Sequence, residues 1–520
     1  MKLNLNLNKV RQSRRLFNNL NIVSQEIETN LNLKPKTQNE SFKFNNMIRE
    51  TLDNSVAHAI IKIVETPIFS LRVFLFLCVI LSSGLCSYLI IELTMSFLSY
   101  GVSTTSRTLY ETPAPFPKVT VCNVNPFTTK YAMEFLKEIN KEVYPYIDIF
   151  NDDQMSKEDL KVKLDLINAI KFKAIFKMNV LNETEKRKLS RPLEEILLNN
   201  DPNSFLWFFD PWYGNCWMFN SGYNQTGHKV PLHTNNFPGE TYGLNLNFYV
   251  NFYQNLTTIN SSPFLGGGHG ALVRIDNSTY LTYYISMDGI KLEPGHMTSI
   301  SLSRKFKSNL PQPYSNCLID NETNAGFHSE LFDLIQNSEY RYTHSLCFFQ
   351  CLQRGFLLEC NCTDAARVSL FANASKCIKN DQLECTNRIW NQQNEYLLGN
   401  CSSECPLECY SNSFDVSLSS YELIPKYYME YLNSKYTNLS DDFPIDKIDA
   451  ETARKSFVCF SIFYHSLTFD ISTESPQMTL ITLFANIGGH LGLFMGVSVF
   501  SLFEPIQVLI EIIYIKFYKK

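Results

Sequence analysis

The sequence predicts an α+β membrane protein in which two transmembrane helices flank a large, disulfide-rich extracellular domain. Three observations carry this prediction: an apolar run near each end of the chain, a concentration of cysteines between them, and many glycosylation sequons in the same interval. The chain has 520 residues and a net charge of −5, without the basic runs typical of nucleic-acid binding. No nucleic-acid partner is therefore expected.

The first apolar run, Val73 to Ile91, contains 19 residues and no charge, which is about the length needed to cross a bilayer core. It begins well inside the chain and lacks a small-residue cleavage site, which favours a membrane helix over a signal peptide. The second run, Ser475 to Phe503, contains no Asp, Glu, Lys or Arg. A buried helix of a soluble domain is the alternative for this second run.

Basic residues flank both runs on the sides away from the central domain. They include Lys9, Arg11, Arg14, Arg15, Arg49, Lys62 and Arg72 before the first run, and Lys516, Lys519 and Lys520 after the second. The positive-inside rule places both termini in the cytoplasm of a multi-pass plasma-membrane protein. The expected segments are 1–66 cytoplasmic, 67–99 transmembrane, 100–474 extracellular, 475–515 transmembrane with a pore, and 516–520 cytoplasmic.

The central domain has the composition of an oxidising compartment. All of the 15 cysteines except Cys78 and Cys86 lie in it. It also holds ten sequons, at Asn182, Asn224, Asn255, Asn260, Asn277, Asn321, Asn361, Asn373, Asn400 and Asn438. Both signals agree with the topology read from charge.

Ten cysteines between 317 and 409 show a mirror-like spacing that favours nested disulfides. Two segments, "CFFQC" and "CSSECPLEC", carry thiols at four-residue steps and could be joined as rungs if they lie antiparallel. Sequence alone cannot fix such a pairing; geometry favours Cys317–Cys409, Cys347–Cys405, Cys351–Cys401, Cys360–Cys385 and Cys362–Cys377. Zinc is the competing interpretation, but the spacings are not finger-like. Cys122 and Cys216 form a plausible further pair, and Cys459 is left over.

Within the domain, the stretch from Tyr131 to about Phe209 is expected to be helical. Later segments, including "GLNLNFYVNFYQNL" and "GALVRID", alternate with period two and predict strands. Lys455 to Ile471 is expected to form one long strand that returns to the membrane.

The second apolar run contains residues that hydrocarbon should exclude. Gly488, Gly492 and Gly496 form overlapping small-xxx-small motifs, for which close helix packing is the simple explanation. Ser498 and Glu504, however, need water or polar partners. A pore lined by several copies would supply both, with glycine carbonyls replacing part of an ion's hydration shell and Glu504 forming an acidic ring at the inner mouth.

The chain resembles the degenerin/epithelial sodium channel superfamily, which includes acid-sensing and FMRFamide-gated channels, over about residues 45 to 518. The motifs that carry the resemblance are "FPKVTVCNVNPF", "GNCWMFNSG", "LPQPYSNC", "CSSECPLEC" and "NIGGHLGLFMGVSVFSLFE". The resemblance implies a homo- or heterotrimer with a palm, β-ball, knuckle, finger (about 128–210) and thumb (about 317–410). It also implies a sodium-selective current, usually blocked by amiloride. The sequence itself has no nucleophile–base constellation and no metal signature, so no enzyme activity, cofactor or metal is expected.

The resemblance also implies roles for individual residues. Gly496, Val497 and Ser498 match the selectivity filter, and the pore-lining residues are Ala485, Asn486, Gly489, Gly492 and Glu504. Gating residues are His58, Ala59, Tyr100 and Tyr314. Ala59 replaces the glycine of the family's His-Gly pair, Tyr314 stands where acid-sensing relatives have tryptophan, Val497 replaces Ala or Ser, and Asn486 replaces Asp.

The opening stimulus is expected to be an extracellular FMRFamide-type peptide. The segment "CNVNPFTTKYAMEFL" resembles the FMRFamide-gated branch, and the aromatic stretch Phe205 to Trp217 could stack a Phe-rich peptide or form core. Proton gating is the alternative activator, but the histidines of the domain do not cluster in sequence. A mechanically gated or constitutively open channel and a non-conducting accessory subunit also remain open.

Overall fold

The computed structural model describes residues 66–145, 160–250, 269–277, 289–319, 329–392, 401–423 and 454–498, with isolated positions at 63, 399, 426, 503, 506–507, 509–510 and 513. The chain divides into two compact units. The smaller unit combines the described parts of Met1–Ser99 and Met478–Lys520. The larger unit is Tyr100–Gln477.

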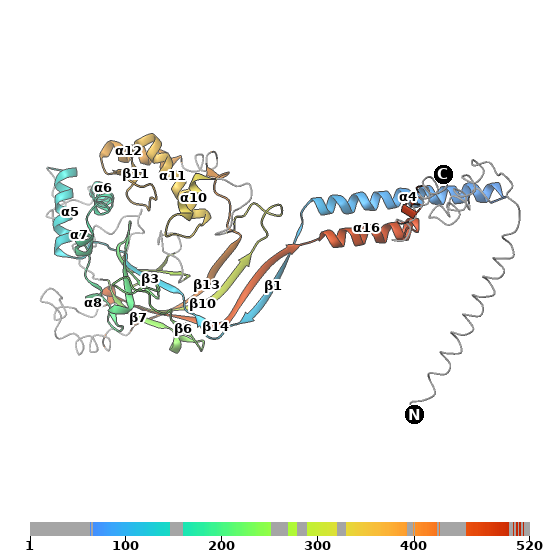
Figure 1. Ribbon diagram of the computed structural model, residues 1–520. Helices are drawn as coiled ribbons and strands as arrows, with labels where there is room; N and C mark the ends of the chain where they lie inside the picture. The colour runs from blue at the N-terminus through green and yellow to red at the C-terminus, as the bar shows by residue number, and fades with distance from the viewer. Residues whose placement is uncertain are drawn as a thin grey trace, which may run out of the picture. The chain divides into compact units, whose positions relative to one another are not determined.

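The described part of the smaller unit contains α4 (Phe69–Leu98) and α16 (Leu480–Met495), which run side by side (Figure 1). Among the described residues, α4 is the helix that is long and apolar enough, by length and composition, to cross a membrane. Helix α16 is apolar but has only 16 residues. Helix α16 is shorter than the second apolar run predicts. The chain is still in strand β14 (Phe457–Pro476) at the start of that run, and it leaves the helix at Gly496.

The larger unit is built around a five-stranded sheet with the order β1-β14-β10-β13, to which β7 is added through β14. Its strands are β1 (Val102–Tyr110), β7 (Leu244–Tyr249), β10 (His296–Ser308), β13 (Tyr410–Glu422) and β14 (Phe457–Pro476). The predicted long strand is β14, whose first half pairs with β7 and whose second half pairs with β1. Strands β10 and β14 are parallel.

A second sheet has the order β4-β5-β3-β8-β9. Its strands are β3 (Lys118–Asn123), β4 (Phe205–Asp210), β5 (Gly214–Phe219), β8 (Ala271–Asp276) and β9 (Ile290–Leu292), and a short pair joins β2 (Ala114–Pro115) to β6 (Thr234–Asn235). Buried residues of both sheets, including Val121, Trp217, Ile300 and Phe460, belong to one core. The two sheets are therefore a single packed body.

Helices α5 (Lys130–Val143), α6 (Leu160–Met178), α7 (Glu183–Lys188) and α8 (Leu193–Ile196) fill most of the segment predicted to be helical. Short 3₁₀ turns cover Pro202–Ser204 and Glu240–Tyr242. The prediction is wrong at its end, because Phe205–Asp210 is strand β4. Its aromatic run favours a strand and pairs with β5 in the hairpin closed at Gly214.

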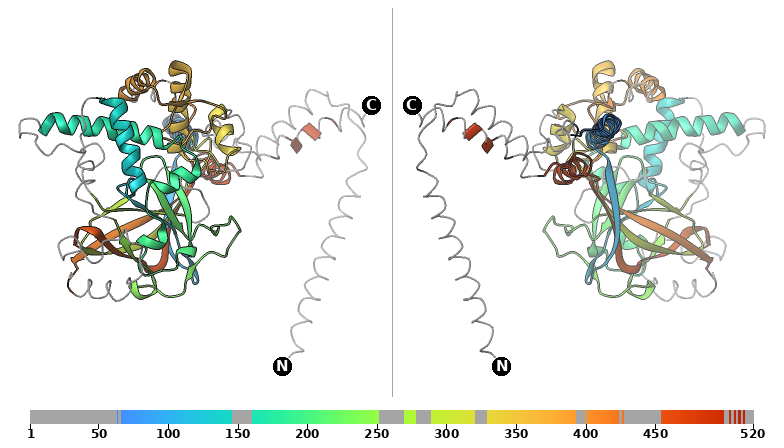
Figure 2. Two further views of the ribbon diagram at one scale, coloured as in Figure 1. Left: turned by 90° about the vertical axis from the view of Figure 1, so that its left-hand side faces the viewer. Right: turned by 90° about the vertical axis from the view of Figure 1, so that its right-hand side faces the viewer.

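The last group of helices comprises α10 (Glu330–Gln336), α11 (His344–Cys360) and α12 (Asn380–Asn391), with the small pair β11 (Thr363–Asp364) and β12 (Lys376–Cys377). Figures 1 and 2 show these helices and α5–α6 on the same side of the sheets. The Lys173 ammonium of α6 donates to the Ile378 carbonyl and the Asn380 side chain, which joins the two helical groups.

Candidate functional site

Helix α16 has one face against α4 and an opposite face without cover in the described chain. Leu483 is 7% exposed, and Ile487 and Phe494 are half-buried at helical spacing from it. The predicted pore residues Ala485, Asn486, Gly489 and Gly492 are all exposed. Because successive helical residues turn by about 100°, Ala485, Gly489 and Gly492 point away from the stripe that meets α4.

The predicted filter begins where α16 ends. Gly496 has φ +69°, a left-handed conformation that glycine adopts readily, and its N–H donates to the Gly492 carbonyl. The Val497 N–H donates to the Leu491 carbonyl, and Val497 is half-buried while Ser498 is exposed. The next predicted pore residue, Glu504, lies outside the described residues, as do His58 and Ala59.

The two predicted gating tyrosines meet in the larger unit. The Tyr100 and Tyr314 rings contact edge to face, with centroids 5.6 Å apart at 88°. Tyr100 has φ +51°, which is unusual for a non-glycine residue. Beyond it, the Gln477 N–H donates to the Gly101 carbonyl at 2.9 Å, so both ends of the unit are tied together beside Tyr100.

The described residues contain six disulfides: the five nested pairs that the spacing favoured and the further pair Cys122–Cys216. They are Cys122–Cys216, Cys317–Cys409, Cys347–Cys405, Cys351–Cys401, Cys360–Cys385 and Cys362–Cys377. Cys347 and Cys351 lie one turn apart on α11, so consecutive rungs join the same face of that helix to the segment 401–409. Cys78, Cys86 and Cys459 form no disulfide, and Cys459 is buried in β14 as expected for a small apolar side chain.

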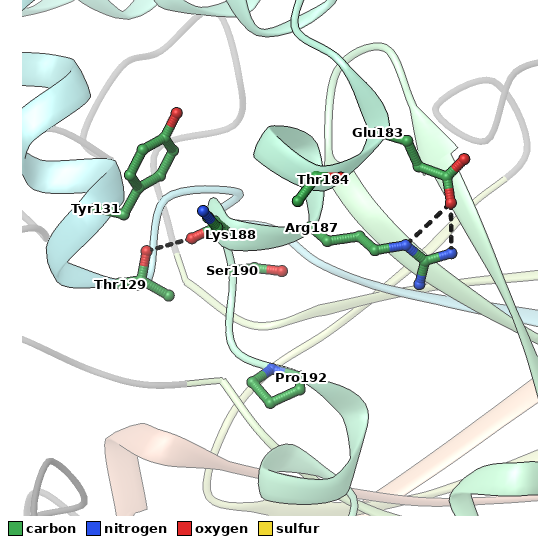
Figure 3. A pocket seen from close by; sticks show the side chains of 8 residues that line it. All are labelled: Thr129, Tyr131, Glu183, Thr184, Arg187, Lys188, Ser190 and Pro192. Atoms are coloured by element: carbon green, nitrogen blue, oxygen red, sulfur yellow. Dashed lines mark hydrogen bonds and ion pairs between the residues drawn. The ribbon is translucent and has the colours of Figure 1, made fainter.

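A cavity of about 500 Å³ lies between the start of α5 and helix α7 (Figure 3). Its lining residues are Thr129, Tyr131, Glu183, Thr184, Arg187, Lys188, Ser190 and Pro192. The Arg187 guanidinium pairs with Glu183 at 2.9 Å and lies 3.9 Å from the centre of the Trp207 ring. The Thr129 hydroxyl donates to the Lys188 carbonyl, which holds α7 against the N-terminus of α5.

The aromatic stretch that could stack a peptide is largely occupied by the chain itself. Phe205 and Trp217 are buried in the core at 1% and 5% exposure. The faces of Trp207 and Phe209 carry the cationic groups of Arg187 and Lys186. Burial lowers the pKa of Lys186, with Glu183 opposing that shift. These aromatics therefore act first as packing and cation–π partners.

A second cavity, of about 480 Å³, lies between β8, the N-terminus of α11 and the start of β13. Its charged residues are Arg274, Asp276, Arg341 and Glu408. Arg274 pairs with Asp276 at 2.9 Å, and Glu408 accepts the His344 N–H at 3.2 Å. Within the described ranges, no group of three or more His, Cys, Asp or Glu side chains is arranged to hold a metal ion.

A family model described as "Amiloride-sensitive sodium channel" matches residues 51–508, which is most of the chain. The chain belongs to the amiloride-sensitive sodium channel family. Both units described above fall within the match, as do the nested disulfides and the helix break at Gly496.

Curated relatives of this family are distant. The degenerin-like protein unc-105 of Caenorhabditis elegans is 24% identical over 373 residues, and the epithelial sodium channel subunit gamma of Xenopus laevis is 26% identical over 321. These matches cover 68% and 60% of this chain but only 38% and 44% of the relatives. The FMRFamide-activated amiloride-sensitive sodium channel of Cornu aspersum is 24% identical over 567 residues, covering 90% of this chain and 83% of that protein.

In this sodium channel family member, two contacts between distant segments were not predicted from the sequence. The Ser82 hydroxyl donates to the Phe494 carbonyl at 2.6 Å, and the buried Arg304 pairs with Glu111 at 2.5 Å. Neither has a sequence signal, because Ser82 stands next to Ser83 and Arg304 sits in the lysine-flanked run "SRKFK". Both contacts join segments that are distant in the chain.

Proposed function

We propose that the protein is a sodium-selective, amiloride-sensitive cation channel of the plasma membrane. It assembles as a trimer, each chain crosses the membrane twice through α4 and the α16 segment, and both termini are cytoplasmic. The observation that carries this proposal is the break of α16 at the left-handed Gly496, followed directly by Val497 and Ser498. The family match over residues 51–508 supports it.

Three copies of the Gly496–Ser498 segment form the filter of this channel. Helix α16 leaves Ala485, Asn486, Gly489 and Gly492 exposed on a face that α4 does not cover, which supports a role in lining the pore. Beyond the helix end, backbone carbonyls and the Ser498 hydroxyl replace water around a sodium ion. Glu504 supplies a ring of negative charge that attracts cations at the inner mouth.

Opening is driven by an extracellular peptide of the FMRFamide type. The match to the FMRFamide-activated relative across 90% of this chain supports this assignment. The Tyr100–Tyr314 contact supports a path from the larger unit to the pore, because Tyr100 immediately follows the membrane segment that holds α4. His58 and Ala59 act at the cytoplasmic end of the same segment.

Three alternatives differ in what they predict. A proton-gated channel opens on acidification without peptide, whereas a mechanically gated or constitutively open channel needs neither. A non-conducting accessory subunit carries current only with another subunit. The intact Gly496 and Ser498 favour a conducting subunit over the accessory one.

Expression in Xenopus oocytes tests the proposal. FMRFamide-type peptides should open an amiloride-sensitive current that reverses near the sodium equilibrium potential, and acid alone should not. Ser498→Ala should change sodium selectivity or conductance without changing surface expression. Absence of current with every stimulus, even after Ala485 is exchanged for a bulkier residue, would contradict a homomeric channel.

A further inference from the structure

The C-terminal end of α16 is tied to α4 by one side chain. The Ser82 hydroxyl donates to the Phe494 main-chain carbonyl at 2.6 Å, across two helices that are 412 residues apart in sequence. The contact lies wholly within the smaller unit. Cys86, one turn further along α4, is 3% exposed, so this face of α4 is packed against its neighbour.

Carbonyls at a helix end need partners from outside the helix. The last four carbonyls of α16, those of residues 492–495, have no partner in the regular helical pattern. Gly496 itself supplies the N–H for Gly492, and Ser82 supplies a hydroxyl for Phe494. In an apolar environment an unpaired carbonyl is costly, so both contacts favour ending the helix at this position.

The position of that end matters because Gly496 follows directly. The Gly496 and Val497 N–H groups fold back on Gly492 and Leu491, so the direction in which the chain leaves the helix depends on where its last turn closes. Glycine at φ +69° permits this turn but does not select it, and apart from its chain neighbours no atom of the described residues packs within 4 Å of the place a Cβ would take. Selection needs an outside contact, and Ser82 provides one.

We propose that Ser82 is a positioning residue that fixes the end of α16 and thereby the orientation of Gly496–Ser498. For ion conduction the inference rests on the proposed function, because only then is this segment a filter. Its structural part concerns the helix end alone and can be measured without any current.

The experiment compares Ser82→Ala with Ser83→Ala in the full-length protein. Ser83 is a matched control, because it loses the same hydroxyl one residue away, and that hydroxyl bonds to the Ile80 carbonyl of its own helix. Hydrogen exchange by mass spectrometry in lipid nanodiscs reports on the Gly496 and Val497 amides. Ser82→Ala should speed their exchange roughly threefold, the effect of a typical interhelical hydrogen bond in a membrane, and Ser83→Ala should not.

A second set of variants separates loss of the bond from misfolding. Ser82→Thr keeps a hydroxyl and should exchange like the wild type, and Ser82→Cys, a weaker donor of similar size, should fall between wild type and Ser82→Ala. If Ser82→Ala does not assemble, the amide exchange of Ser82→Cys is compared with that of Ser83→Ala instead. Equal exchange in Ser82→Ala (or Ser82→Cys) and Ser83→Ala would overturn the proposal.

Recordings then connect the helix end to selectivity. In oocytes, Ser82→Ala should lower the sodium-to-potassium permeability ratio at unchanged surface expression, while Ser83→Ala keeps the wild-type ratio. A wild-type protein without sodium current refutes the proposed function, and the exchange result still decides the role of Ser82. A conducting Ser82→Ala variant with the wild-type ratio refutes the link to the filter.

Discussion

Arg304 and Glu111 form an ion pair whose partners are unequally buried, and this inequality makes a testable prediction. The Arg304 side chain is 3% exposed, whereas that of Glu111 is 43% exposed. Arg304 also donates to the Leu467 carbonyl and lies 5.3 Å and 5.2 Å from the Tyr464 and Phe469 ring centres. It fills the irregularity where β14 loses register with β10. The perturbations are Glu111→Gln and Arg304→Met.

The magnitude follows from the geometry. Charges about 4 Å apart attract by about 4 kcal/mol at an effective dielectric constant of about 20. Solvent reaches the Glu111 carboxylate, so about half of this remains, or roughly 2 kcal/mol. Glu111→Gln loses that attraction and leaves the Arg304 charge buried. Arg304→Met leaves Glu111 in water and fills the space between the rings, at a cost of about 1 kcal/mol.

The assay is thermal unfolding of the full-length protein in detergent, followed by fluorescence-detected size exclusion. Glu111→Gln should lower the midpoint more than Arg304→Met, and adding Arg304→Met to Glu111→Gln should restore part of the loss. Asp415→Asn is the matched control, because it breaks the adjacent Lys305–Asp415 pair, whose side chains are 51% and 54% exposed, and should change nothing measurable. An Arg304→Met variant less stable than Glu111→Gln would refute this reasoning.

Three further predictions concern stability. Burial lowers the pKa of Lys118 to about 8. Unfolded chains therefore bind more protons than folded ones between about pH 8 and the ordinary lysine pKa of 10.5, and the contribution of Lys118 to stability rises with pH across that window. Lys118→Met should be more stable than wild type at about pH 7.5, and the gap in melting temperature should narrow by about pH 9.5; a constant gap contradicts this. Gly243→Ala should lower the free energy of unfolding by about 3 kcal/mol, since a Cβ would lie 2.3 Å from the Ile462 carbonyl oxygen. Gly399→Ala is the control and should be tolerated, because no atom of the described residues packs within 4 Å of its Cβ position. Equal losses of stability in thermal unfolding would argue against a close backbone approach at Gly243. Replacing Cys351 and Cys401 by serine removes one disulfide and should lower the free energy of unfolding by about 2 kcal/mol, because Cys347–Cys405 still closes nearly the same loop. Removing both disulfides should cost more than the two single losses added together. Strictly additive shifts of the unfolding midpoint would contradict the shared loop.

The cysteine spacing favoured the disulfide ladder but did not fix it. Cys347 and Cys351, four residues apart, lie on one face of α11, so nested pairing with an antiparallel segment has good geometry, and the structure has that pairing. The strands of the larger unit were predictable where period-two alternation is clear, as in β8 and β14. The helix prediction was wrong at Phe205–Asp210. This segment follows a helical stretch directly, and its strand depends on pairing with β5.

For the candidate site too, some features were predicted from the sequence and others were not. The polar residues of the second apolar run indicated a pore, and the family resemblance assigned Gly496–Ser498 as its filter. The uncovered face of α16 follows from helical periodicity once α4 is known to lie on the other side. The end of α16 did not follow, since "GGHLGLFMG" contains four glycines and only one of them has positive φ. Hydropathy alone continued the helix through Gly496.

The sequence by itself determined the apolar segments, the oxidised domain between them, the nested cysteines and the residues expensive to place in lipid. These depend on composition and on spacing within single elements, where burial and helical or strand periodicity decide. Only the tertiary structure decided which of two adjacent serines reaches α16, which arginine is buried in the sheet, and which aromatic faces are already covered. Those choices depend on hydrogen bonds and ion pairs between segments far apart in the chain, and their partners are set by packing, which no local pattern records.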